Sequence, residues 1–176
     1  MLVVAAVSAA VAVRRGGSLS NLASTSFEWT GVLIAALVLQ VAAELFAPSD
    51  ISSTGLLVVI YLAVAAFVLR NRMLPGILIA VAGLAMNVLV ISLNGAMPVS
   101  RWAADIAGVE SVGNEIGIKH EIADPQTTLP WLGDVIPLPE TRRVISAGDV
   151  VLAAGIAMLV YRRTLHKPKP VRRASG

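Results

Sequence analysis

The chain has 176 residues, of which 56% are hydrophobic and 14% charged, with a net charge of +3 and a mean hydropathy of +0.79. Soluble domains carry roughly 25% charged residues, so this composition excludes an ordinary soluble domain and indicates a membrane protein. Because the chain has no cysteine, it has neither a disulfide framework nor a thiolate metal site.

Long apolar segments determine the predicted architecture. They are too numerous to be buried as core helices in a protein of this size, whereas a bilayer solvates them. We predict an all-α fold, a polytopic membrane helix bundle with five transmembrane helices and one long extracytoplasmic loop. The helices are expected at about residues 1–14, 30–47, 53–70, 73–93 and 146–161, and the loop at 94–145.

The first helix is short for a membrane span. Residues 1–13 reach roughly 20 Å at ~1.5 Å per residue, against a hydrocarbon core of ~30 Å. Arg14 and Arg15 follow the apolar run, which is the reverse of the order in a cleavable signal peptide. We interpret it as a short span; a half-inserted helix or a misplaced start codon are the alternatives. Trp29, at the end of the following polar linker, is an expected interfacial anchor.

Polar side chains interrupt the second and fourth helices. Gln40 and Glu44 lie four residues apart on one face, and Asn87 and Asn94 lie seven apart. With Asp149 at the start of the last helix, they are candidates for lining an outward-facing pocket, because polar groups in a membrane usually face the bundle interior. The alternative is that they only form hydrogen bonds between helices or meet water at the bilayer boundary.

The loop begins with a helix stop. Asn94 and the glycine after it end the fourth helix, and Ser100 is expected to cap a short amphipathic segment at 101–107 that Gly108 stops. This segment would place Trp102 in the lipid headgroups as a second interfacial anchor.

A second apolar element of the loop is bracketed by prolines. Residues 129–139 are too short to span a bilayer, and we predict an ordered lid against the last two helices, with Trp131 as a third interfacial anchor. His120, between two charged residues, is expected to be a solvated loop residue with no second metal ligand at a suitable spacing.

The distribution of Lys and Arg predicts the orientation. Ten basic residues lie in the linker between the first and second helices, the turn between the third and fourth helices, and the tail at 162–176. All three segments fall on one side of the membrane, and the other side holds four basic residues. The N-terminus and the long loop are therefore expected outside a bacterial plasma membrane. Residues 1–161 form the transmembrane domain, and the basic tail is expected to be cytoplasmic and disordered. Its partner is anionic lipid of the bilayer, and nucleic acid is not expected.

Three motifs carry a resemblance. The fourth helix ends in NGxMPVS at residues 94–100, the lid reads LPWLGDVIPLP at 129–139, and the last helix opens with SxGDV at 146–150. In these motifs the chain resembles an uncharacterised family of small multi-pass membrane proteins of actinobacteria, firmicutes and related bacteria. The resemblance implies a bacterial plasma-membrane protein and brings no known activity.

The chain also has a faint resemblance to lipoprotein signal peptidases, which hold two aspartates at the outer membrane face. Asp149 matches the aspartate that opens the last helix of those enzymes. The Phe-Asn pair that precedes it there is missing, and Asp134 lacks the Gly-Asn-x-x-Asp-Arg setting of the other aspartate. Ser146 and Asp149 also fit a simpler role, a capping box at the start of the last helix.

The residues favour a non-enzymatic membrane component: a sensor, chaperone or accessory subunit with an outward-facing polar pocket under the loop lid. The alternative is an intramembrane aspartyl hydrolase, in which Asp134 and Asp149 share a proton and act as acid and base. A small transporter is the third hypothesis. It is disfavoured because the predicted spans contain few charged residues and the sequence has no visible internal repeat. No cofactor or metal site is expected. A membrane-protein partner is compatible with this hypothesis, but the sequence does not identify it.

Overall fold

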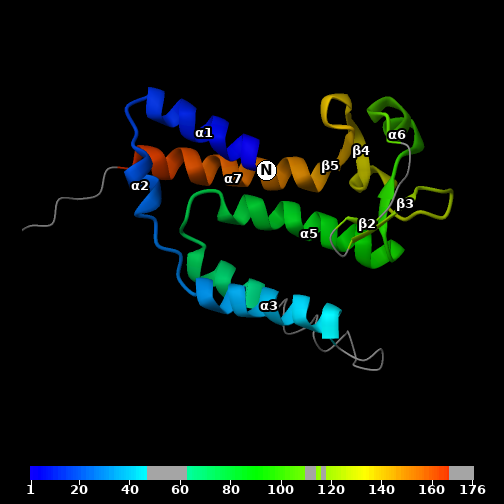
Figure 1. Cartoon of the computed structure of the whole chain (residues 1–176), viewed down its shortest axis with the longest axis horizontal. Coiled ribbons are helices and arrows are strands. Elements are labelled where there is room, and N and C mark those ends of the chain that lie inside the picture. The colour runs from blue at the N-terminus through cyan, green and yellow to red at the C-terminus, as the bar shows by residue number, and fades with distance from the viewer. Residues whose placement is uncertain (47–62, 110–113, 116–117, 167–176) are drawn as a thin grey trace, which may run out of the picture.

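The computed structural model describes residues 1–46, 63–109, 114–115 and 118–166. Within these ranges, a group of helices is joined at one end to a small sheet (Figure 1). The helices are α1 (Leu2–Arg14), α2 (Leu19–Ala23), α3 (Thr30–Phe46), α5 (Ile77–Asn94), α6 (Arg101–Ala107) and α7 (Ala147–Leu165). Residues 63–71 are also helical, so the helix expected at 53–70 lies partly outside the described residues.

The region expected as a long loop folds into a five-stranded mixed sheet with the order β2-β3-β1-β4-β5. Its central strand β1 runs parallel to both β3 and β4, while β2 and β5 pair antiparallel with their neighbours. The strands are β1 (Met97–Val99), β2 (Asn114–Glu115), β3 (Ile118–Ile122), β4 (Asp134–Leu138) and β5 (Arg143–Ser146). Two single 3₁₀ turns, η1 (Pro130–Leu132) and η2 (Pro139–Thr141), flank β4. We call the sheet with α6, η1 and η2 the cap, residues 96–146.

The prediction of an all-α bundle with five transmembrane helices is therefore wrong. Two properties of the sheet hide it from sequence patterns. β1 is only three residues long and has Pro98 at its centre, a residue that normally argues against a central strand because it cannot donate a ladder hydrogen bond. All three of its residues are buried, so it lacks the alternation that marks a half-buried strand.

One helix among the described residues is long and apolar enough to cross a membrane. It is α5, whose 18 residues have a mean hydropathy of 2.2. Only 17% of this window is buried inside the protein, unlike the core helix of a soluble domain. The other long helices of the described part fall short: α1 and α3 have only 13 and 17 residues, and α7 contains the three charged residues Asp149, Arg162 and Arg163.

Close approach of α5 and α7 forms the centre of the helical part. A Cβ atom added at Gly83 would collide with backbone atoms of Leu152 and Gly148, and one added at Gly155 would collide with the backbone of Ala80. Glycine at these points lets the two backbones meet directly, as small residues do where helices pack closely. On its other side, α7 packs against α1 (Figure 1).

A small apolar core joins the helices to the cap. Val90 of α5, Met97 of β1 and Leu132 of η1 are 0%, 4% and 5% exposed and pack together. Ala147, at the start of α7, lies against this cluster. The predicted lid thus has a buried anchor at Leu132, whereas the neighbouring Trp131 is 63% exposed. Because α5 and α7 each contribute to the cluster, the cap is held against both helices.

Candidate functional site

A polar network lies where the cap meets α5 and α7. Ser146 caps α7: its Oγ accepts a hydrogen bond from the backbone N–H of Asp149 at 3.0 Å, and its own backbone N–H donates to Asp149 Oδ2 at 3.0 Å. Asn87 of α5 completes the network. Its Nδ2 donates to Asp149 Oδ1 at 2.9 Å, and its Oδ1 accepts from Ser146 Oγ at 2.9 Å. The predicted capping box is confirmed, and Asn87 extends it across the helix pair.

This network leaves little room for a ligand. A Cβ atom added at Gly148 would overlap the side-chain amide of Asn87, so the two helices enclose that amide tightly. Both carboxylate oxygens of Asp149 accept hydrogen bonds from protein donors. Its negative charge also lies in the first turn of α7, where it interacts favourably with the helix dipole. The arrangement is that of a structural joint.

A second polar pair lies in the sheet of the cap. Asp134 on β4 and His120 on β3 flank the central strand β1, and His120 Nε2 is 3.5 Å from Asp134 Oδ2. Their side chains are 8% and 18% exposed. The expectation of a solvated loop histidine is wrong, because His120 belongs to a strand and lies partly inside the cap. An imidazole beside a buried carboxylate compensates the cost of removing that charge from water.

The sequence around His120 has an alternating pattern that predicts a strand, although the charged residues on either side of it suggest a solvated loop. In the sequence at 118–122 the histidine stands between two charged residues, with an isoleucine two positions away on either side. A period of two over five residues predicts a strand with His120 on its apolar face.

The two aspartates that would form a hydrolytic pair both lie next to β5 in the fold. Asp134 is the register partner of Ser146 across β4 and β5, and Asp149 lies in the first turn of α7, which follows β5. Their carboxylates nevertheless have different neighbours: His120 for Asp134, and Asn87 with the first turn of α7 for Asp149.

Asn94 lines an open cavity of about 270 Å³ at the end of α5. Its amide joins the helix to the loop after β3, since Nδ2 donates to the carbonyls of Val90 and Thr128, and Oδ1 accepts from the N–H of Thr128. Both apolar and polar residues surround the cavity. It is lined by Leu93, Asn94, Ala96, Pro98, Glu121, Ile122, Asp124, Gln126, Thr127 and Thr128. Of the five predicted pocket residues, Asn87 and Asp149 meet in the joint, and Asn94 faces this separate cavity.

The remaining predicted residues lie elsewhere. Gln40 and Glu44 belong to α3, and their side chains lie outside the described part of the structure. Trp29 follows α2, with the Arg70 guanidinium carbon 5.5 Å from its ring centroid. Trp102 on α6 is 63% exposed. Among the described residues, no group of three or more His, Asp or Glu side chains is placed to hold a metal ion.

A family model matches residues 24–161, which run from the end of α2 to the last turns of α7. The chain belongs to DUF5317, a family of unknown function. The match includes the joint, the His120–Asp134 pair and the cavity, whereas α1 and the basic tail lie outside it. No curated protein and no solved structure matches the chain. None of these comparisons shows the likeness to lipoprotein signal peptidases.

Proposed function

We propose that this DUF5317 protein is a non-enzymatic, multi-pass component of a bacterial plasma membrane, in which the helices hold the cap rigidly at the outer surface as a recognition module. The cap would serve as the sensing or docking part of an accessory subunit. Support for the membrane comes from α5, which is long, apolar and mostly unburied. Support for a platform comes from the apolar core and the polar joint that hold the cap against α5 and α7.

Charge supports the orientation. The end of the molecule opposite the cap has six arginines in or beside the helix ends: Arg14, Arg15, Arg70, Arg72, Arg162 and Arg163. Basic residues next to membrane spans favour the cytoplasmic side, so the cap would face outward. Trp29 lies near the basic end, and Trp131 lies in η1, which contacts the outer ends of α5 and α7. Exposed tryptophans at both ends of a helix group are typical of the two membrane boundaries.

The joint is the observation that favours a non-enzymatic role. An aspartyl hydrolase needs two carboxylates around one water, with one of them able to take up its proton. Asp149 instead uses both oxygens to accept hydrogen bonds from its own helix turn and from Asn87. A carboxylate held in this way supports structure, and the cap remains as the functional surface.

Substitution of Asp149 tests the proposal. In cells that lack the chromosomal copy, Asp149→Asn is expected to retain cellular function once its abundance matches that of the unsubstituted chain, because the amide keeps one oxygen for Asn87. Glu28→Gln, which removes an exposed acid outside the cap, is the control. Loss of function in Asp149→Asn at normal abundance, with Glu28→Gln unaffected, would overturn the non-enzymatic role in favour of the hydrolase.

A further inference from the structure

Two arginine pairs far apart in the sequence come together at the end of the molecule opposite the cap. The turn after α1 is fixed to the last turn of α7, where the backbone N–H of Ser18 donates to the carbonyl of Thr164 at 2.9 Å. The two helices also pack along their length (Figure 1). The pair at 14–15 therefore lies at the same end of the molecule as the pair at 162–163.

Arg15 and Tyr161 form an ordered donor group at this end. Arg15 Nη1 donates to the hydroxyl of Tyr161 at 2.7 Å, and its guanidinium carbon lies 5.8 Å from the centroid of that ring. A guanidinium has five N–H donors, so others remain, and a hydroxyl that accepts a bond still has its own proton to donate. Both side chains thus present donors in a fixed arrangement of the kind that suits phosphate oxygens.

The side chain of Arg163, at the same end of α7, has a buried donor without a partner among the described residues. Its Nε is buried and has no hydrogen-bond partner among the described residues, a rare state for a charged donor. The side chain is therefore held partly inside the protein, next in sequence to an exposed arginine at 162. Residues 1–27 and 150–176 contain no Asp or Glu, so neither segment neutralises these arginines. Glu28, the first acid after α2, pairs with Arg70 at 2.7 Å.

We propose that the ends of α1 and α7 together form a binding site for the phosphate of an anionic phospholipid of the inner leaflet, with Arg15 and Tyr161 as its fixed donors. The inference rests on the proposed membrane function, because the site must reach the headgroup layer. A lipid fits better than a soluble phosphate, since the donors lie at the ends of apolar helices and one is an aromatic hydroxyl, the amphipathic type of group that occupies membrane interfaces. The site belongs to the folded helices and not to the basic tail.

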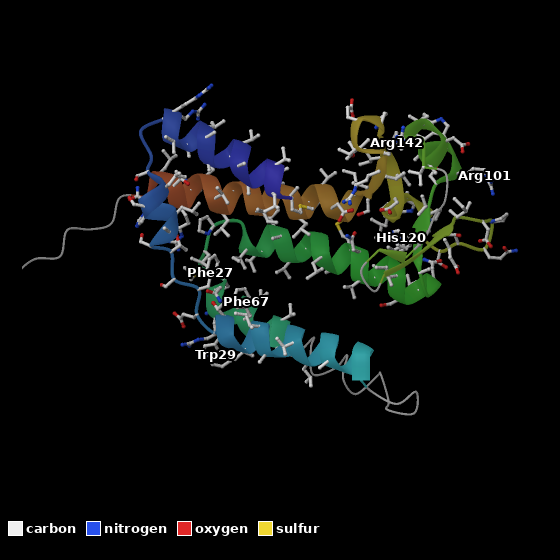
Figure 2. The ribbon with its side chains drawn as sticks, in the orientation of Figure 1. Phe27, Trp29, Phe67, Arg101, His120 and Arg142 are labelled. Carbon is white, nitrogen blue, oxygen red and sulfur yellow. The ribbon has the colours of Figure 1, made fainter. Side chains whose placement is uncertain are left out.

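Lipid binding by the purified full-length chain tests this site. Native mass spectrometry in detergent compares phosphatidylglycerol, phosphatidylcholine and inorganic phosphate as ligands. We expect a preference for phosphatidylglycerol, reduced about fivefold in Arg15→Gln, as befits one arginine at a charged membrane surface. Tyr161→Phe keeps the ring but removes the hydroxyl and is expected to weaken binding in the same direction. Arg142→Gln, in the cap at the other end of the molecule, is the matched control and should bind normally (Figure 2).

Two comparisons separate this site from its alternatives. Replacing Lys167, Lys169, Arg172 and Arg173 by glutamine in the full chain should leave the preference intact, and its loss would assign the binding to the tail. Equal binding of both lipids, equal affinity in Arg15→Gln and Arg142→Gln, or binding of inorganic phosphate as tight as that of the lipid would overturn the inference. Alkaline extraction of membranes tests the proposed function separately: a chain released by carbonate is not integral, whereas a retained chain without lipid preference contradicts the lipid site alone.

Discussion

Asn87 connects two helices and the cap through one short side chain. Its amide donates to Asp149 through Nδ2 and accepts from Ser146 through Oδ1, so both ends of the side chain are engaged. Isolated polar residues in an apolar helix are usually satisfied by a partner on the neighbouring helix, because an unpaired amide there is costly.

Substitution of Asn87 by alanine should destabilise the joint. The change leaves Ser146 Oγ without its acceptor and one oxygen of Asp149 without its donor, for which we expect a loss of about 1–3 kcal/mol in the free energy of unfolding. Denaturant titration of the detergent-solubilised protein measures it. Gln126→Ala, which removes an exposed amide that lines the cavity, is the control. Equal stability of the two variants would mean that the network contributes nothing.

Among the elements, helices and their caps could be predicted from local patterns. The capping residues Ser100 and Ser146 and the stop at Gly108 are where the sequence indicates them, because each signal lies within a few residues of the helix end it controls. The sheet could not be predicted in this way. Its central strand pairs Met97 with His120, more than twenty positions away, and no local pattern encodes a parallel partner at that distance.

The helix pair α5–α7 gives a second prediction at the level of elements. Gly83→Ala places a methyl group against the backbone of Leu152, which cannot move without separating the helices, so we expect a loss of about 1–3 kcal/mol in stability. Gly31→Ala on α3 is a close control, since a Cβ there meets nothing within 4 Å. Thermal unfolding followed by circular dichroism distinguishes the two. A Gly83→Ala variant as stable as Gly31→Ala would show that the close approach of α5 and α7 does not require glycine.

In the whole molecule, the arginine pairs at 14–15 and 162–163 lie at the ends of α1 and α7 that are opposite the cap (Figure 1). The charge count along the chain already separates these two ends, whereas the folding of one end into a sheet is visible only in the structure. The convergence of the two arginine pairs, by contrast, needs the packing of α1 on α7, which composition does not specify. An asymmetric molecule of this kind should have one orientation in a membrane.

Single cysteines test that orientation without background labelling, because the chain has none of its own. Glu140→Cys lies on an exposed turn of the cap, and His166→Cys lies exposed at the end of α7. With the cap outside, a membrane-impermeant maleimide should label Glu140→Cys on intact cells and His166→Cys only after the membrane is opened. Labelling of His166→Cys but not of Glu140→Cys on intact cells would invert the orientation. Labelling of both on intact cells would place both ends of α7 outside, so that α7 could not cross the membrane from the cap to the basic end.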